Sequence, residues 1–332
     1  MKLTNELLKT AIFGVVEFEE EAGALKMHRF TRKQRAYFSE TENSINKPLK
    51  ALANSNMVLD FYTDSTKFVF EAIGKPASRQ NLCYFDLYIN GTMVDNFGYE
   101  SAEPGTVNYS RELAGGRKRI TVYFPCLAAI EIQSVSLDDG ASFEPAKRDR
   151  KLLFIGDSIT QGYIGKYPSL TYSGIVMTGL NAESVNLGIG GNVFDELDLD
   201  EDFPYTPDTI FVAYGTNDWS KKLDYKENAR KFLDKLTGMY PEAKVYMVLP
   251  IWRANAKERK VEKNLPVDFE QVHIDLAKVA ERYENVTPVN GLQLVPHIRE
   301  TLCPDAVHPN ELGFLFYGQE LLKFVLAEEK VR

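Results

Sequence analysis

The chain has few cysteines and no long apolar run, and each lack excludes a class of protein. Its 332 residues include three cysteines, Cys83, Cys126 and Cys303. Their odd number and wide spacing predict a reducing compartment and no disulfide framework. None has a nearby Cys or His at metal-ligand spacing, so the sequence predicts no zinc site. No apolar run is long enough to span a bilayer, and we expect no membrane partner.

An excess of positive charge is also missing. The chain has 39 Lys and Arg against 47 Asp and Glu, and its net charge of -8 argues against a nucleic-acid partner. Residues 1–9 are amphipathic, and Glu6 interrupts the apolar core that a secretory signal needs. We therefore expect a cytoplasmic protein with no nucleic-acid partner.

The N-terminal part of the sequence, residues 1–148, has the pattern of a β-sandwich domain. Short runs rich in apolar, β-branched and aromatic residues occur at 57–62, 67–73, 85–89, 119–124 and 129–137. Asn90-Gly91 joins the third of these runs to another, which is a strong hairpin signal. Many short strands separated by turns predict an all-β sandwich or jelly roll.

The pattern changes after a polar stretch at 145–150, and residues 149–332 form the second predicted domain. Five strand candidates, 152–155, 184–187, 209–213, 244–249 and 286–289, alternate there with helical stretches. Apolar residues recur at helical spacing from Phe269 to Tyr283, and a last helix follows from Glu311. This alternation predicts a parallel sheet covered on both faces, and hence an α/β domain.

The stretch 151–162 is the most informative in the chain. Four apolar residues at 152–155 predict a buried strand, and Gly156 allows a tight turn. Asp157 and Ser158 then follow the carboxyl end of that strand, where ligands collect in open α/β sheets. Ser158 is placed to be a nucleophile. The alternative is that Asp157 or Ser158 only caps the next helix.

A base for this nucleophile is found near the other end of the chain. Asp305 and His308 are three residues apart, just before the last helical run. Within one turn of chain, a carboxylate can reach Nδ1 of the histidine while Nε2 points towards Ser158. The stretches 186–192 and 214–218 each follow an apolar run, so all four stretches can meet at one edge of one sheet.

These four stretches resemble the sequence blocks of the SGNH, or GDSL-type, serine hydrolases. Residues 156–158 (Gly-Asp-Ser) match the nucleophile block, with Ile159 where the family usually has Leu. The glycine block resembles 186–192, the asparagine block 215–218 and the terminal block 305–308, in family order. The resemblance implies a flavodoxin-like α/β hydrolase domain that needs no metal or organic cofactor.

The resemblance also implies a role for the matched side chains. Ser158 would be the nucleophile of an acyl-enzyme mechanism, His308 its base and Asp305 the acid that orients the base. The oxyanion hole would consist of the Ser158 N–H, the Asn217 amide and one glycine N–H.

Two adjacent glycines match the family's oxyanion glycine, and the sequence leaves open which of them is the donor. Of Gly190 and Gly191, we favour Gly191, because it stands immediately before Asn192.

The layout of a sandwich followed by an SGNH domain is similar to carbohydrate esterases that remove acetyl groups from plant polysaccharides. This resemblance implies an esterase for a short-acyl, acetyl ester of a carbohydrate, whose partner is a small-molecule or oligosaccharide ester substrate. Trp219, Trp252 and Arg253 follow strands on the expected side of the site, where an aromatic ring can stack on a sugar and an arginine can bond its hydroxyls. For the tryptophans, core packing is the alternative.

The sequence also leaves other functions open. The chain could act on another small-molecule or lipid ester, as a hydrolase or acyltransferase, or be a sugar-binding protein with an inactive hydrolase domain. Six acids in residues 195–202 could bind Ca²⁺, but the sequence favours a solvated acidic loop. We expect His273 at the surface or at an interface, and His297 outside the site.

Overall fold

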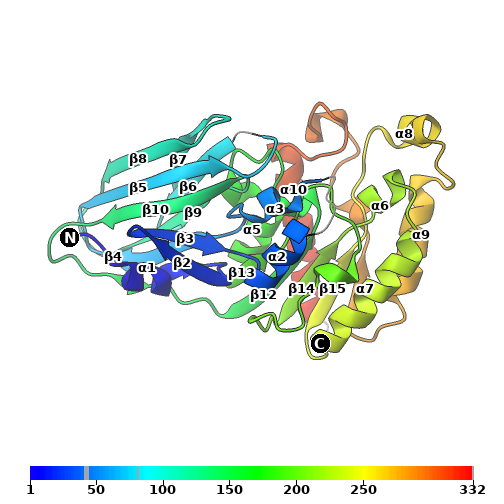
Figure 1. Cartoon of the computed structure of the whole chain (residues 1–332), viewed down its shortest axis with the longest axis horizontal. Helices are drawn as coiled ribbons and strands as arrows, with labels where there is room; N and C mark the ends of the chain where they lie inside the picture. The colour runs from blue at the N-terminus through cyan, green and yellow to red at the C-terminus, as the bar shows by residue number, and fades with distance from the viewer. Residues whose placement is uncertain (41–44, 81, 331–332) are drawn as a thin grey trace.

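The computed structural model describes residues 1–40, 45–80 and 82–330, and three sheets occur in this part of the chain (Figure 1). The antiparallel strands are β1 (Ile12–Phe13), β2 (Glu17–Glu21), β3 (Ala24–His28), β4 (Val58–Thr63), β5 (Lys67–Pro76), β6 (Leu82–Ile89), β7 (Thr92–Glu100), β8 (Gly105–Glu112), β9 (Lys118–Tyr123), β10 (Ala128–Ser136) and β11 (Glu144–Pro145). The parallel strands are β12 (Arg150–Gly156), β13 (Ala182–Asn186), β14 (Thr209–Ala213), β15 (Lys244–Val248) and β16 (Val286–Val289).

The helices are distributed over both halves of the chain. They are α1 (Asn5–Ala11), α2 (Arg32–Glu40), α3 (Lys47–Ala51), α4 (Ser158–Gln161), α5 (Tyr172–Gly179), α6 (Thr216–Ser220), α7 (Tyr225–Met239), α8 (Ala256–Lys263), α9 (Phe269–Ala280) and α10 (Glu311–Lys330). Single turns of 3-10 helix occur at η1 (Pro168–Leu170), η2 (Glu196–Asp198), η3 (Gly291–Gln293) and η4 (Arg299–Thr301). Of the described helices, none is both long and apolar enough to cross a membrane.

Two antiparallel sheets make up the N-terminal half. Their strand orders are β1-β4-β9-β6-β7, with β11 also paired to β4, and β2-β3-β10-β5-β8. Residues of β5 alternate between buried and exposed, so Phe68 and Phe70 face a core that also contains Phe85 of the other sheet. Asn90 and Gly91 both have positive φ, as the predicted hairpin turn between β6 and β7 requires.

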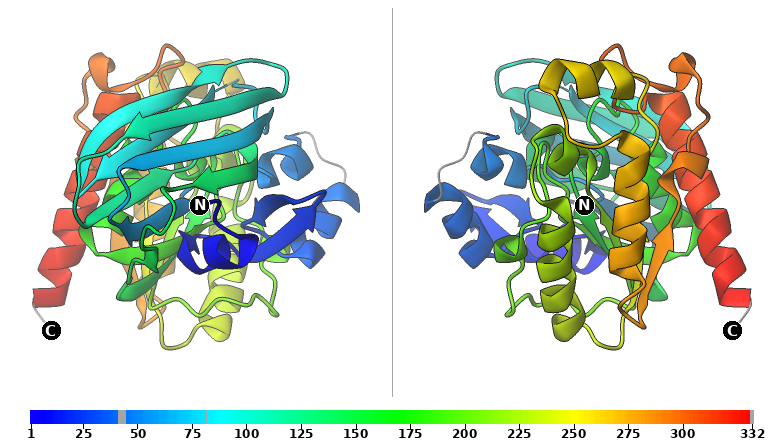
Figure 2. Two further views of the ribbon diagram at one scale, coloured as in Figure 1. Left: turned by 90° about the vertical axis from the view of Figure 1, so that its left-hand side faces the viewer. Right: turned by 90° about the vertical axis from the view of Figure 1, so that its right-hand side faces the viewer.

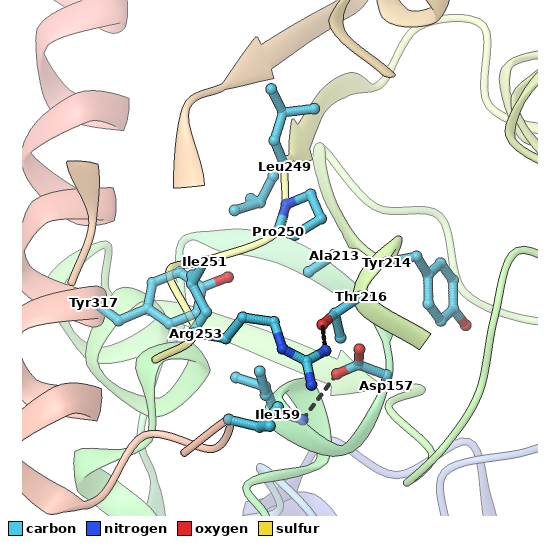
Figure 3. A pocket seen from close by; sticks show the side chains of 12 residues that line it. Asp157, Ile159, Ala213, Tyr214, Thr216, Leu249, Pro250, Ile251, Arg253 and Tyr317 are labelled. Atoms are coloured by element: carbon cyan, nitrogen blue, oxygen red, sulfur yellow. Dashed lines mark hydrogen bonds between the residues drawn. The ribbon is translucent and has the colours of Figure 1, made fainter. Parts of the chain in front are cut away.

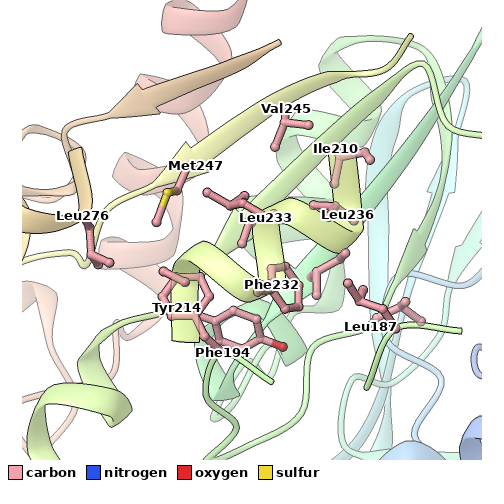
Figure 4. Packing of buried hydrophobic residues seen from close by; sticks show 14 of the residues in the cluster. Leu187, Phe194, Ile210, Tyr214, Phe232, Leu233, Leu236, Val245, Met247 and Leu276 are labelled. Atoms are coloured by element: carbon pink, nitrogen blue, oxygen red, sulfur yellow. The ribbon is translucent and has the colours of Figure 1, made fainter. Parts of the chain in front are cut away.

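The parallel sheet has the strand order β13-β12-β14-β15-β16, which is the flavodoxin-like order that we expected. Helices α7 and α9 cover one face, where Phe232 and Leu236 of α7 pack on Ile210 and Val245 (Figure 4). Helices α5 and α10 cover the other face (Figure 2, right, where α10 is red). Both faces of β12 are therefore buried, which explains its uninterrupted apolar run.

The sequence suggested only a β-sandwich for the N-terminal half, but this half also contains helices. Strands β2, β3 and β8 and helices α2 and α3 were not predicted. The segment that carries these two helices packs on the α/β half, because Phe30, Phe38 and Ala51 belong to the same buried cluster as α7 and α9. The predicted boundary at residue 148 falls between β11 and β12.

A buried arginine links the two halves. Arg29 is fully buried, and its guanidinium donates to the carbonyl oxygens of Ala53 (2.7 Å) and Lys50 (2.8 Å) in the N-terminal half. It also donates to those of Asn186 (2.6 Å) and Gly188 (2.7 Å), just after β13. The N-terminal half therefore holds the loop in which the predicted glycine block lies.

The acidic stretch at 195–202 forms a second link, so its interpretation as a solvated loop is wrong for two of its acids. Asp198 is 9% exposed and accepts from Lys47 Nζ (2.7 Å). Asp200 is 5% exposed, accepts from Thr31 Oγ1 (2.7 Å) and pairs with Lys33 (3.0 Å). These carboxylates bind side chains of the N-terminal half, and no metal-binding cluster was found among the described residues.

Candidate active site

The turn after β12 places Ser158 at the first position of α4. Asp157 caps this helix, because its Oδ1 accepts from the N–H of Ile159 at 2.9 Å. A Cβ at Gly156 would lie 2.0 Å from Thr160 Oγ1 and 2.8 Å from the Ala213 oxygen. Only glycine fits there, so the strand can turn into the helix without displacing β14. Of the two residues that the sequence offered as a helix cap, Asp157 is the one that caps α4.

Three side chains from opposite ends of the α/β half form a continuous hydrogen-bonded relay. Ser158 Oγ lies 2.7 Å from His308 Nε2, and His308 Nδ1 lies 2.6 Å from Asp305 Oδ2. Asp305 Oδ1 accepts from the N–H groups of Val307 (2.9 Å) and His308 (3.0 Å). Burial acts to raise the pKa of Asp305, but these hydrogen bonds hold it well below its usual value. An ionised Asp305 keeps Nδ1 protonated and leaves Nε2 free to accept the serine proton.

The loop that carries Asp305 and His308 is closed on itself before α10. The Cys303 N–H donates to the backbone oxygen of His308 at 2.8 Å, and Leu302 and Pro309 form an isolated antiparallel β-bridge. Ala306 lies in this loop with φ of 66°, a left-handed conformation that costs about 1 kcal/mol or more outside glycine. The closure fixes the spacing of acid and base within one turn of chain.

Candidate oxyanion donors lie beside Ser158. Asn217 stands in the first turn of α6, and its Nδ2 donates to the Asn192 oxygen at 2.9 Å, which fixes the amide. Gly190 already donates its N–H to Gln161 Oε1 at 2.8 Å. Gly191 has φ of 84°, which favours glycine, and a Cβ there would lie 3.1 Å from Ile45 Cγ2.

A cavity of about 280 Å³ opens at Ser158, and both halves of the chain line it. The α/β half contributes Ser158, Tyr163, Gly190, Gly191, Thr216, Asn217, Asp305, Val307 and His308. The N-terminal half contributes Ile45, Lys50, Ser78 and Arg79, none of which the sequence singled out. The Tyr163 ring lies 4.6 Å from that of His308 and covers the base on one side.

Arg253 does not line this cavity, which contradicts its predicted contact with a sugar. It is 6% exposed and lines a cavity of only about 20 Å³ behind the nucleophile, where it points towards Asp157 (Figure 3). Its guanidinium donates to Thr216 Oγ1 (3.0 Å) and to Asn255 Oδ1 (2.8 Å). The Asn255 amide donates in turn to the backbone oxygen of Asp305 at 3.3 Å. Arg253 therefore links α6 to the loop that carries Asp305 and His308.

The predicted stacking of Trp219 on a sugar ring is also wrong. Trp219 is 1% exposed, its Nε1 donates to the Val267 oxygen at 3.0 Å, and its ring packs 5.0 Å from that of Phe269. Trp252 is half-buried, lies outside the lining of the cavity and stacks on the ring of His297 at 5.2 Å. An apolar face must be exposed to stack on a sugar, so the alternative of core packing holds for Trp219.

The expectation that His273 lies at the surface or at an interface fails as well. His273 is 7% exposed rather than at the surface, and its ring nitrogens lie 3.0 Å from the Phe269 oxygen and 2.6 Å from the Pro250 oxygen. It braces the loop after β15 from α9. Its position within the apolar helical stripe from Phe269 to Tyr283 was the sequence signal that could have predicted its burial.

Residues 154–314 match the sequence model of the GDSL-like lipase/acylhydrolase family. This segment contains all four blocks that resemble the GDSL-type hydrolases, from Gly156 to His308. The family resemblance of the four sequence blocks is therefore confirmed for this segment.

A curated relative and two solved structures extend the comparison. The chain is 25% identical over 245 residues to the cellulase/esterase CelE of Acetivibrio thermocellus, a match that covers 60% of this chain but 29% of that protein. The salicylyl-acyltransferase SsfX3 of a tetracycline biosynthetic pathway has a TM-score of 0.79 at 18% identity, covering 96% of this chain and 94% of that one. The acetyl xylan esterase Est2A of Butyrivibrio proteoclasticus has a TM-score of 0.65 at 15% identity, and the match covers 99% of this chain and 98% of that one. These two structures share the fold with this chain over both halves.

Proposed function

We propose that this protein is a serine esterase that hydrolyses a short-acyl, acetyl ester of a carbohydrate through an acyl-enzyme. The observation that carries the proposal is the relay from Asp305 through His308 to Ser158, which ends in a cavity of about 280 Å³. A hydroxyl, a neutral imidazole and an ionised carboxylate in this order are the groups that acyl transfer to serine needs.

In the first half of the reaction, Ser158 Oγ attacks the ester carbonyl carbon while its proton passes to His308 Nε2. The resulting oxyanion accepts from the N–H groups of Ser158 and Gly191 and from the amide of Asn217. We assign the glycine to Gly191 because the Gly190 N–H is already bonded to Gln161. His308 then donates its proton to the leaving alcohol oxygen as the C–O bond breaks.

In the second half, water replaces the alcohol. His308 Nε2 takes a proton from water as the water oxygen bonds to the acyl carbon, and returns it to Ser158 Oγ as the acyl-serine bond breaks. Asp305 stabilises the imidazolium in both halves. An acceptor alcohol in place of water would make the same groups an acyltransferase.

The size and lining of the cavity support a small, polar substrate. The lining combines the polar Lys50, Ser78, Arg79 and Asn217 with the apolar Ile45 and Val307, whereas a long acyl chain would need a continuous apolar groove. The likeness to CelE and to Est2A supports a carbohydrate as the alcohol. The complete relay argues against a sugar-binding protein with an inactive hydrolase domain.

Turnover of an aryl acetate tests the mechanism. Ser158→Ala should lower kcat by at least about 10⁴-fold, since both the nucleophile and its proton transfer are lost. Ser39→Ala, at an exposed position of α2, is the matched control and should leave turnover unchanged. A fluorophosphonate should label the wild type at Ser158. Retained activity or labelling elsewhere would refute the mechanism.

Two substrate series test the proposed ester. Acetyl esters should be cleaved faster than octanoyl esters of the same alcohol, and acetylated oligosaccharides should be deacetylated. Faster cleavage of the octanoyl ester would identify a lipid esterase. Transfer of the acyl group to an added alcohol, faster than to water, would identify an acyltransferase.

A further inference from the structure

Three cationic side chains surround the glycine pair of the candidate active site. Lys50 Nζ, from α3, donates to the Gly190 oxygen at 2.6 Å. Lys221 Nζ, directly after α6, donates to the Gly191 oxygen at 2.7 Å. Arg79, on the connection after β5, lines the cavity beside Lys50. The chain as a whole has a net charge of -8, so this concentration of positive charge is local.

Lys50 and Arg79 have no ion-pair partner among the described residues, whereas the buried carboxylates of Asp157 and Asp218 act on Lys221 from a distance. Among the described residues, none of these three side chains forms an ion pair, although nearby Lys47 pairs with Asp198 at 2.7 Å. Asp305 is the one acid among the described residues of the cavity lining, and its carboxylate is hydrogen-bonded to His308. With Asp305 ionised, Lys50 and Arg79 still give the described lining an excess of positive charge.

A buried hydroxyl accompanies the charges. Ser78 precedes Arg79 and lines the same cavity, yet it is only 7% exposed. Its Oγ has no hydrogen-bond partner among the described residues. A buried polar group without a partner costs free energy, so a bound acceptor at this position would be favoured.

We propose that Arg79, Lys50 and Ser78 form a subsite for a carboxylate of the substrate, and that the natural substrate is an O-acetylated acidic sugar. This inference rests on the proposed esterase function and names its substrate class. Arg79 presents two parallel N–H donors to a carboxylate, Lys50 adds a second positive charge, and Ser78 Oγ–H donates to a carboxylate oxygen.

The local electrostatics support the same assignment. Burial lowers the pKa of Lys50 to about 8, and the positive charges of Arg79 and Lys221 contribute to this shift. A bound anion would offset this repulsion and hold Lys50 in its charged form. The subsite also gives the N-terminal half a function, because Lys50, Ser78 and Arg79 all come from it.

Two substrates with the same acetyl group, one with a carboxylate at C6 and one with a neutral group there, test the subsite. The acetylated methyl glycoside of glucuronic acid carries a carboxylate, and its methyl ester at C6 is neutral. At about 0.01 M ionic strength, where the Debye length is about 30 Å, the acid should have the higher kcat/KM. Arg79→Gln should reduce this preference by about tenfold, as expected for one charge-assisted hydrogen-bond partner.

Arg282→Gln is the matched control, because it removes the same charge from an exposed position outside the cavity and should preserve the preference. Equal kcat/KM values for the acid and its methyl ester in the wild type would overturn the subsite. So would a preference that Arg79→Gln does not change. Deacetylation of the neutral ester that depends on Ser158 would still support the esterase function, whereas deacetylation of neither compound by an enzyme that cleaves the aryl acetate would overturn the subsite alone.

A binding measurement separates the subsite from catalysis. Calorimetry of glucuronic acid with Ser158→Ala should give a dissociation constant about tenfold lower than with the Ser158→Ala, Arg79→Gln double variant. Identical constants would contradict the subsite even if the two substrates were hydrolysed at different rates.

Discussion

The carboxyl of Asp157 makes the stability of this protein depend on pH, and Asp157→Asn should remove that dependence. Asp157 is 3% exposed and lies behind the nucleophile, where burial raises its pKa from 3.8 to about 6. The difference of about 2 pH units corresponds to about 3 kcal/mol, at 1.36 kcal/mol for each unit.

The sign follows from proton binding in the two states. Between about pH 4 and about pH 6, folded Asp157 keeps a proton that the unfolded chain has already released, so stability falls as the pH rises. His308, Lys221 and Arg253 favour the charged form, but burial outweighs them. The asparagine side chain of the variant cannot ionise, and its amide oxygen can still accept from the Ile159 N–H. The stability of the variant relative to the wild type should therefore rise by up to about 3 kcal/mol between about pH 4 and about pH 7.

Urea unfolding followed by tryptophan fluorescence measures this difference. Both proteins are compared at matched pH values across the window, and the free energy of unfolding is extrapolated to water. Any loss of the weak contact from Asn217 to Asp157 (3.4 Å) shifts all points equally and leaves the slope unchanged. Burial also raises the pKa of Asp218 to about 7, but that carboxyl is present in both proteins. A stability difference that is constant with pH would refute the reasoning.

Three further substitutions test the site and its support. Asn217→Ala should lower kcat by roughly 10²–10³ with little change in KM, the effect of one lost oxyanion donor; a change in KM alone would instead make Asn217 a substrate-binding residue. Asp305→Asn should slow aryl acetate turnover less than His308→Ala, because Asp305 is 39% exposed and water can replace part of its effect; full activity of Asp305→Asn would indicate a Ser–His dyad. Arg29→Leu should lower the free energy of unfolding by roughly 3–5 kcal/mol and also reduce kcat, since it leaves buried carbonyls of both halves without donors. An unchanged kcat would show that the contact between the halves does not affect catalysis.

The parallel sheet and the edge that carries the candidate active site were predictable because local sequence signals specify them. The apolar run of β12, Gly156 and the helix stripe starting at Phe269 each specify their structure within a few residues. Ser158, Asp305 and His308 stand at strand or helix ends that the alternation of elements already placed at one edge. Their hydrogen bonds then needed only the correct sheet order.

The tryptophan and arginine predictions failed because loop position does not determine side-chain direction. Trp219 follows β14 as expected, but the short helix α6 turns its ring towards α9 instead of the cavity. Arg253 follows β15, yet its guanidinium lies under α6, 5.3 Å from the Trp219 ring. Each residue is near the site in sequence, whereas tertiary packing decides which face of the loop it occupies.

The contribution of the N-terminal half could not be predicted for a different reason, since it depends on contacts that span more than 100 residues. Lys50 contacts Gly190 across 140 positions, and Arg29 contacts Gly188 across 159. No local period or motif identifies a single lysine or arginine as an interdomain contact. Because Arg29 bonds the carbonyls of both Lys50 and Gly188, the same side chain positions the proposed carboxylate subsite and the loop of the candidate oxyanion donor. A substitution at Arg29 should therefore alter the preference for the acidic substrate as well as kcat, which a role confined to global stability would not do.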